Sequence, residues 1–224
     1  MLRDVTNDLL SAFLPARCPG CGKRGAVVCV ECARMLRFAP HVVPPPGIAW
    51  WTACFAYEGV ARELIARAKY RNERVALQWL AERVARACAN APMRIDIVTW
   101  APASEARRRS HGVDHASVLA RAVGAAFGLP TKALLCRARG STAQTGRDAR
   151  SRRLGPLLSA RHVPEGVTVL IVDDVATTGG TLAAAGRALR AAGAHEILAA
   201  TAARTPTPGA RAAPAAYTPS AGTL

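Results

Sequence analysis

The sequence predicts a mixed α/β domain with a mainly parallel sheet of about five strands flanked by helices, preceded by a small module with four cysteines. Residues 167–172 form an unbroken, mostly β-branched run, which is typical of a strand buried on both faces of a parallel sheet. Similar runs alternate with Ala- and Leu-rich helical segments. With 224 residues, 50% of them hydrophobic, there is room for one such domain and a small appendage.

Chemistry that suits a phosphorylated sugar follows the buried run at once. Asp173 and Asp174 stand where the predicted strand ends, and a Thr-Thr-Gly-Gly-Thr turn at 177–181 leads into a helix that ends near Gly193. Ligands of open α/β sheets bind at the carboxyl ends of strands. A Gly/Thr-rich turn offers N–H groups and hydroxyls to a phosphate, and adjacent acids accept bonds from vicinal hydroxyls or hold Mg²⁺. The alternative is an ordinary βα turn in which the glycines serve geometry alone.

The segments upstream predict two strands separated by two helices. Residues 50–57 are rich in aromatic residues and predict a strand, which Glu58-Gly59 ends as a turn. Apolar residues at helical spacing predict helices over 60–70 and about 73–89. Residues 95–101 predict the second strand, and the proline that follows ends it.

The middle and the end of the chain complete the predicted sheet. Asp114 is the expected N-cap of a helix that reaches Phe127 and closes with Gly128. Further strands are expected at 131–136 and 195–203.

The four N-terminal cysteines predict a structural zinc site. Their pattern is C-x2-C-x7-C-x2-C, formed by Cys18, Cys21, Cys29 and Cys32. Two close pairs can present four thiolates to one Zn²⁺, which gives a closed, non-catalytic site. Disulfides are the alternative, and they fit poorly with a chain that lacks an export signal. The other three cysteines, Cys54, Cys88 and Cys136, are expected to be buried free thiols.

The domain boundaries follow from composition. We expect an amphipathic helix and zinc module over 1–38, a Pro-rich linker over 39–47, the α/β domain over 48–205 and a disordered tail over 206–224. No stretch is long enough for a membrane span, and Asp4 and Asp8 interrupt any signal-peptide core. The sequence therefore predicts a cytoplasmic protein.

Charge predicts an anionic partner. The net charge is +15, from 30 basic and 15 acidic residues, and this surface attracts phosphate, pyrophosphate or nucleic acid. Arginines gather at 107–109, after the predicted strand end at Pro102, and again over 137–153. The first segment could bind pyrophosphate or simply be a soluble surface loop. The second could close over an anionic ligand or equally contact nucleic acid. Only 5% of residues are aromatic, so no stacking platform for single-stranded nucleic acid is evident.

Residues 173–181 closely resemble the phosphoribosyl pyrophosphate (PRPP) signature of type I phosphoribosyltransferases. The resemblance implies that Asp173 and Asp174 bind the ribose hydroxyls, with Mg²⁺ beside the pyrophosphate. It also implies that the loop formed by Ala176, Thr177, Thr178, Gly179, Gly180 and Thr181 holds the 5′-phosphate. In the purine-salvage enzymes an Asp acts as base in this loop, and Thr177 stands in its place here, which argues against purine salvage.

From residue 9 to 205 the chain as a whole resembles the ComF family of competence proteins. The shared elements are the four cysteines, Lys69-Tyr70-Arg71, Ala101-Pro102-Ala103-Ser104, Arg107 to Gly112, Gln144 and the PRPP signature. The resemblance implies that Ala103, Ser104 and Arg109 face the pyrophosphate, and that the protein takes part in DNA uptake. The chain departs from the family at His111-Gly112-Val113-Asp114-His115 and at Trp100, both near the expected pyrophosphate site.

Three functions stay open on the sequence. The first is a Mg²⁺-dependent phosphoribosyltransferase in which a nucleophile attacks ribose C1 and pyrophosphate leaves. The second is a non-catalytic module of the DNA-uptake machinery that binds PRPP or single-stranded DNA. The third is an adaptor whose zinc finger docks a partner such as a competence helicase. The sequence does not identify the acceptor nucleophile.

Overall fold

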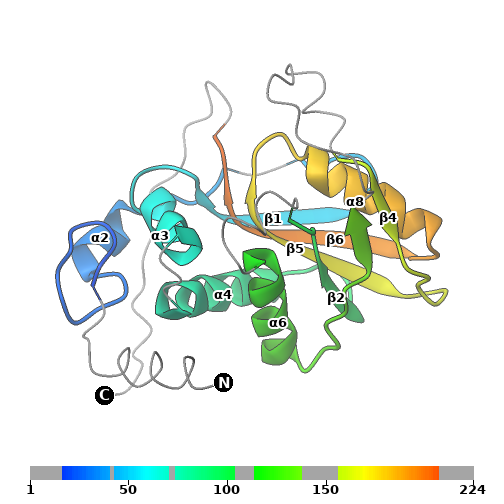
Figure 1. Ribbon diagram of the computed structural model, residues 1–224, viewed down its shortest axis with the longest axis horizontal. Coiled ribbons are helices and arrows are strands. Elements are labelled where there is room, and N and C mark those ends of the chain that lie inside the picture. The colour runs from blue at the N-terminus through cyan, green and yellow to red at the C-terminus, as the bar shows by residue number, and fades with distance from the viewer. Residues whose placement is uncertain (1–16, 41–42, 71–73, 104–113, 138–155, 207–224) are drawn as a thin grey trace.

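The computed structural model describes residues 17–40, 43–70, 74–103, 114–137 and 156–206. Helices and strands alternate along most of this part of the chain, as the sequence predicts (Figure 1). In chain order the elements are α2 (Val30–Met35), β1 (Trp50–Ala56), α3 (Gly59–Tyr70), α4 (Arg74–Cys88), β2 (Ile97–Trp100), α6 (His115–Phe127), β3 (Leu135–Arg137), β4 (Leu158–Ala160), β5 (Thr168–Ala176), α8 (Gly180–Ala191) and β6 (Glu196–Arg204).

The central sheet is parallel, with the strand order β1-β6-β5-β2. Helices α4 and α6 lie on one side of this sheet and α8 on the other (Figure 1). Residues Thr168 to Val172 of β5 are buried, because both faces of the strand are covered by helices. The predicted α/β fold with a mainly parallel sheet is confirmed.

The described part of the sheet has four strands rather than the expected five. The segment predicted as a strand at 131–136 joins β2 only through one bridge, between Val98 and Thr131. The chain then turns away, and Leu135–Arg137 pairs antiparallel with Leu158–Ala160 in a separate two-stranded sheet. Cys136, the middle residue of β3, is exposed, whereas the sequence predicts a buried thiol. Cys54 and Cys88 are buried as expected.

Strand β5 is also longer than the predicted run, and this changes the position of the acidic pair. Pairing with β6 continues through Asp173 and Val175 to Ala176, which lies opposite Arg204. Asp173 and Asp174 therefore lie within the last residues of the strand and do not follow its end. Pairing with β6 at Asp173 and at Val175 therefore fixes the backbone on both sides of Asp174.

The four-cysteine module packs on the α/β domain. Cys18, Cys29 and Cys32 belong to the same apolar core as Val60 and Leu64 of α3. The segment that follows the module also pairs with the sheet edge, because Ala56 N–H donates to Arg37 O (2.9 Å) and Ala39 N–H donates to Cys54 O (3.2 Å). The start of the predicted linker is thus attached to β1.

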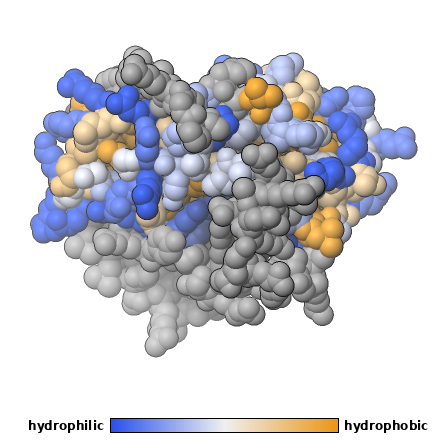
Figure 2. Space-filling model, turned by 90° about the horizontal axis from the view of Figure 1, so that it is seen from above, coloured by the Kyte–Doolittle hydropathy of each residue, from blue (hydrophilic) through white to orange (hydrophobic). Residues whose placement is uncertain are grey.

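Hydrophobic side chains are scattered on the surface. Figure 2 shows them singly or in small groups between hydrophilic residues, on the face that it displays and among the described residues. Scattered apolar residues of this kind are ordinary on protein surfaces. Within the described ranges, no helix has both the length and the hydropathy needed to cross a bilayer.

Asp96 anchors the start of β5 and provides a test of the fold. Its Oδ2 accepts a hydrogen bond from Thr168 N–H (3.0 Å), and its own N–H donates to Thr168 O (3.0 Å). The Thr168 hydrogen bond and, after it, Arg94 hold the pKa of Asp96 below its ordinary value of 3.8. A lowered pKa means that this contribution to stability is present above pH 4 and is lost as the pH falls through the pKa of the folded protein.

We expect Asp96→Asn to lower the free energy of unfolding at pH 7 by about 1 kcal/mol, since it weakens one hydrogen bond to the backbone. The difference from the wild type should shrink as the pH is lowered below 4. Urea titrations over that range measure both quantities. Glu165→Gln, on an exposed residue, is the control; an equal loss in the two variants would contradict the anchoring role of Asp96.

Candidate functional site

The acidic pair lies at the carboxyl edge of the sheet, where both side chains are half-buried. Asp173 Oδ1 accepts a hydrogen bond from Asp174 N–H (2.8 Å), and Asp174 Oδ1 accepts one from Val175 N–H (2.6 Å). These bonds hold one oxygen of each carboxylate against the backbone, so that the other oxygen is directed away from it. Such oxygens are suitable acceptors for hydroxyl groups and ligands for Mg²⁺.

Lys69 is the partner of Asp174. Its Nζ lies 2.8 Å from Asp174 Oδ2, and the two side chains are only 18% and 17% exposed. Lys69 follows Ile65 by one helical turn on α3, and Ile65 is buried in the apolar core. From the sequence alone, Lys69 belongs to the Lys69-Tyr70-Arg71 element and is not placed in the site. The sequence does contain one indication of this position: Lys69 lies on the same side of its helix as the buried apolar residues.

The Thr/Gly turn connects the acidic pair to the N-terminus of α8. Gly179 is the N-cap and has φ = 75°, in the left-handed region that favours glycine. Thr177 and Thr178 are exposed, and Thr178 Oγ1 accepts a hydrogen bond from Gly180 N–H (3.4 Å). The first N–H groups of a helix have no partner within it, so this terminus can bind an anion.

A second turn reaches the same edge from β2. Trp100 lies opposite Val172, and Ala101 N–H donates to Val172 O (3.3 Å). The chain therefore leaves the sheet at Pro102 beside the acidic pair. Had β2 run the other way, this turn would lie at the opposite edge of the sheet and no shared site would exist.

Two long-range hydrogen bonds brace the Pro102 turn. Arg137 Nε–H donates to Pro102 O (3.1 Å), and Ala103 N–H donates to Asp114 Oδ2 (3.2 Å). Asp114 does occupy the N-cap position of α6, as predicted, but its carboxylate makes no capping bond and holds the turn instead. The predicted C-terminal Gly128 has the expected left-handed conformation.

Several predicted residues lie outside the described part of the chain. These are Ser104, the arginines at 107–109 (Arg109 among them), Gly112, Gln144 and Arg71. The structure therefore brings together Asp173, Asp174, Ala103 and residues 176–181, while the expected arginine contribution stays a prediction.

The four cysteines form a compact cluster. All four Sγ atoms lie within 4.8 Å of one another, and Cys21 Sγ is 3.6 Å from Cys29 Sγ. Cys18 N–H donates to Lys23 O and Gly22 N–H donates to Cys18 O, which forms a tight knuckle around the first pair (2.8 Å each). None of the four is in a disulfide, so the alternative of two disulfides is not what the structure has.

The surroundings of the cluster differ from one thiol to the next. Burial opposes ionisation of Cys18, but hydrogen bonds from the backbone at Cys29, Cys21 and Gly20 outweigh it and lower its pKa to about 6. Burial and the neighbouring thiols raise the pKa of Cys32. Four thiolates this close repel one another unless a cation holds them, so the donor set fits Zn²⁺. A Cβ on Gly20 would lie 2.6 Å from Cys32 Sγ, which explains the glycine beside the cluster.

Comparison with known proteins identifies the domain. A model of the phosphoribosyl transferase domain matches residues 110–217, somewhat less than half of the chain. No curated protein sequence matches this chain.

Solved structures with low overall similarity carry related descriptions. One is described as the allosteric regulatory enzyme of purine biosynthesis (24% identity, 57% of this chain, 26% of that chain, TM-score 0.40). Another is the glutamine PRPP amidotransferase of B. subtilis with ADP and GMP (25% identity, 56% of this chain, 26% of that chain, TM-score 0.40). A third is the adenine phosphoribosyltransferase of Thermoanaerobacter pseudethanolicus (16% identity, 59% of this chain, 83% of that chain, TM-score 0.38). This chain thus spans about a quarter of the first two proteins.

Because these TM-scores are low, the assignment rests on the matched domain and on the sheet itself. The parallel sheet, the helices on both of its faces and the matched domain show the fold of a type I phosphoribosyltransferase, joined to a small N-terminal four-cysteine module.

Proposed function

We propose that this protein binds PRPP with Mg²⁺ and acts as a phosphoribosyltransferase. The observation that carries the proposal is the continuity of β5, the acidic pair, the Thr/Gly turn and the N-terminus of α8. These four features offer, in one short stretch, acceptors for ribose hydroxyls and donors for a 5′-phosphate. The matched phosphoribosyl transferase domain includes this stretch.

Each part of the ligand has a proposed partner. Residues 176–181 hold the 5′-phosphate, and Asp173 and Asp174 accept bonds from the ribose 2′- and 3′-hydroxyls. The turn at Ala103 and Ser104, with Arg109, receives the pyrophosphate. In the proposed reaction a nucleophile forms a bond to ribose C1 as the C1–O bond to pyrophosphate breaks, and the electron pair leaves with the pyrophosphate.

The carboxylates of the acidic pair suit Mg²⁺, provided that the ion pair between Asp174 and Lys69 is accommodated. Oxygen donors are the ligands that Mg²⁺ prefers, but one oxygen of Asp174 is already paired with Lys69. Direct coordination by that oxygen requires Lys69 to move, whereas a contact through a water or a hydroxyl leaves the ion pair intact. When bound, Mg²⁺ would neutralise the pyrophosphate charge.

We also propose one structural Zn²⁺, bound by Cys18, Cys21, Cys29 and Cys32. The cluster geometry and the contact of this module with α3 support a role in folding. With four protein ligands the ion has no open position for substrate.

Membership of the ComF family and a role in DNA uptake stay predictions from the sequence. The four-cysteine cluster and the net charge of +15 agree with them. Binding of single-stranded DNA, docking of a competence helicase and a cytoplasmic location are likewise predictions, and a non-catalytic or adaptor role in DNA uptake is the alternative to the transferase proposed here.

The acidic pair gives the first test. We expect Asp173→Asn with Asp174→Asn to weaken binding of PRPP and Mg²⁺ at least about a hundredfold, because two charged acceptors are lost at about 1.5–3 kcal/mol each. Isothermal titration calorimetry measures the affinity, and thermal unfolding checks the fold. Glu165→Gln is the control. Unchanged affinity in the double variant would show that the signature does not bind PRPP.

The metal gives the second test. Elemental analysis of protein purified without chelator should find one Zn²⁺ per chain, and Cys29→Ser should lose the metal and lower the melting temperature. Cys136→Ser, at an exposed cysteine outside the cluster, should retain the metal. A folded protein without metal would reject the zinc proposal.

The ion pair of Lys69 gives the third test. Removing one partner of a largely desolvated pair leaves the other charge uncompensated, so Lys69→Met should cost about 1–3 kcal/mol of stability. The double variant with Asp174→Asn should recover part of that loss, because no carboxylate is then left unpaired. Urea unfolding of the four proteins measures the coupling. Strictly additive losses would mean that the two residues do not interact in solution.

A further inference from the structure

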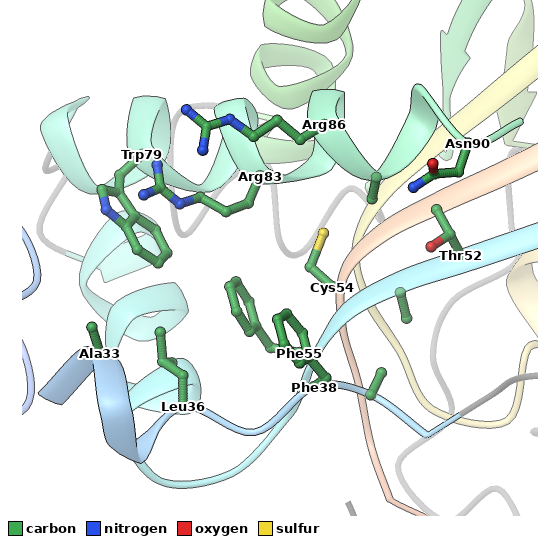
Figure 3. Close-up of a pocket in the computed structure, with 13 residues that line it drawn as sticks. Ala33, Leu36, Phe38, Thr52, Cys54, Phe55, Trp79, Arg83, Arg86 and Asn90 are labelled. Carbon is green, nitrogen blue, oxygen red and sulfur yellow. The ribbon is translucent and has the colours of Figure 1, made fainter. Parts of the chain in front are cut away.

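A separate cavity lies between the four-cysteine module, the edge strand β1 and helix α4. Its volume is about 440 Å³, within the range typical of sites for small ligands. One face of α4 lines it with residues spaced at helical intervals, and the opposite wall comes from β1 and from the chain after α2 (Figure 3). The lining residues used below are Thr52, Ala53, Cys54, Trp79, Arg83, Arg86, Ala87 and Asn90.

This cavity is not part of the PRPP-type site. None of the acidic pair, Lys69 or the Thr/Gly turn lines it. Strand β6 separates the two places, because β1 pairs with β6 and β6 pairs with β5. Ala53 lies level with Thr201, which in turn lies level with Asp173, so the backbones at the two sites are about 10 Å apart, two strand spacings.

One end of the cavity is aromatic and cationic. Arg83 lies over the Trp79 ring, with its guanidinium carbon 3.8 Å from the ring centroid. Figure 3 shows Arg83 and Arg86 extending from α4 in the same direction, toward Trp79. Glu82 pairs with Arg83 (3.0 Å), while Arg86 is exposed and forms no ion pair with a described residue. The available positive charge at this end is therefore that of Arg86.

The centre and the other end of the cavity are uncharged. Ala53, Cys54 and Ala87 supply an apolar middle, and burial raises the pKa of Cys54, so its thiol stays neutral. Thr52 and Asn90 lie together at the end away from Trp79 (Figure 3). A hydroxyl and an amide both donate and accept hydrogen bonds. No carboxylate is among the described residues of the lining.

We propose that this cavity binds a nucleotide. The ligand needs an anionic group for Arg86, a flat apolar body for the middle and a hydrogen-bonding edge for Thr52 and Asn90. A nucleobase joined through its sugar to a phosphate has these three parts in this order. The assignment is independent of the function proposed for the acidic pair, since it uses none of the same residues.

Calorimetry with the full-length protein tests the assignment, with AMP and UMP as probes. We expect at least one of them to bind. Adenosine and inorganic phosphate should each bind more weakly than AMP, because each lacks one half of the recognised structure.

Three variants locate the binding. Arg86→Gln should weaken it about tenfold, as expected for a lost hydrogen bond to a charged group, and Ala87→Phe should abolish it by filling the cavity. Arg121→Gln, on an exposed arginine of α6 outside the cavity, should have no effect. Binding should also survive the double variant Asp173→Asn with Asp174→Asn, so its outcome is distinguishable from that of the PRPP site.

The outcomes separate the proposal from its rivals. No binding of either nucleotide, or equal affinity in the wild type and Arg86→Gln, overturns it. Loss of binding in the acidic-pair variant also overturns it, because the nucleotide would then occupy the other site. A short oligonucleotide that binds more tightly than AMP, with the same dependence on Arg86, supports the site and identifies nucleic acid as the source of the nucleotide.

Discussion

The parallel pairing of β5 with β2 on one side and β6 on the other is the constraint on which the proposed site depends. Because the three strands run in one direction, their carboxyl ends meet at one edge of the sheet. That edge carries the acidic pair, the Thr/Gly turn and the Pro102 turn. The burial of β5 on both faces makes its register costly to change, since a slip of one residue would place the carboxylates on the wrong faces.

The ion pair between Lys69 and Asp174 links this edge to the helical layer. A carboxylate beside another carboxylate in a half-buried position is unfavourable, and an ammonium at 2.8 Å offsets the repulsion. Lys69 reaches that position because α3 packs on α4, with Ile65, one turn before Lys69, buried in the apolar core. The same helix contacts the four-cysteine module at its other end, so α3 connects the proposed zinc site with the acidic pair.

The described surface has two chemically distinct places that we propose as sites for anions. The first, at the carboxyl edge, uses backbone N–H groups and hydroxyls, which suit a phosphate on a sugar. The second, along α4, offers the guanidinium group of Arg86 and an apolar wall, which suit an anion attached to a flat ring. Strand β6 lies between the two places, so they share no strand of the sheet.

The sequence by itself determined the α/β class, most of the helices, the buried strand, the Thr/Gly turn and the cysteine cluster. Each of these features follows from the spacing of residues along the chain. In the same way, Gly128 after an apolar helical segment predicts the left-handed residue that ends α6. Tertiary structure decided the rest. Lys69 forms an ion pair with a residue more than a hundred positions away. The carboxylate of Asp114 accepts a hydrogen bond from the Pro102 turn rather than capping its own helix. Residues 131–136 pair with the central sheet through one bridge only. The cavity along α4 exists only because three segments distant in sequence meet there. Contacts of this kind depend on how elements pack, which no local pattern encodes.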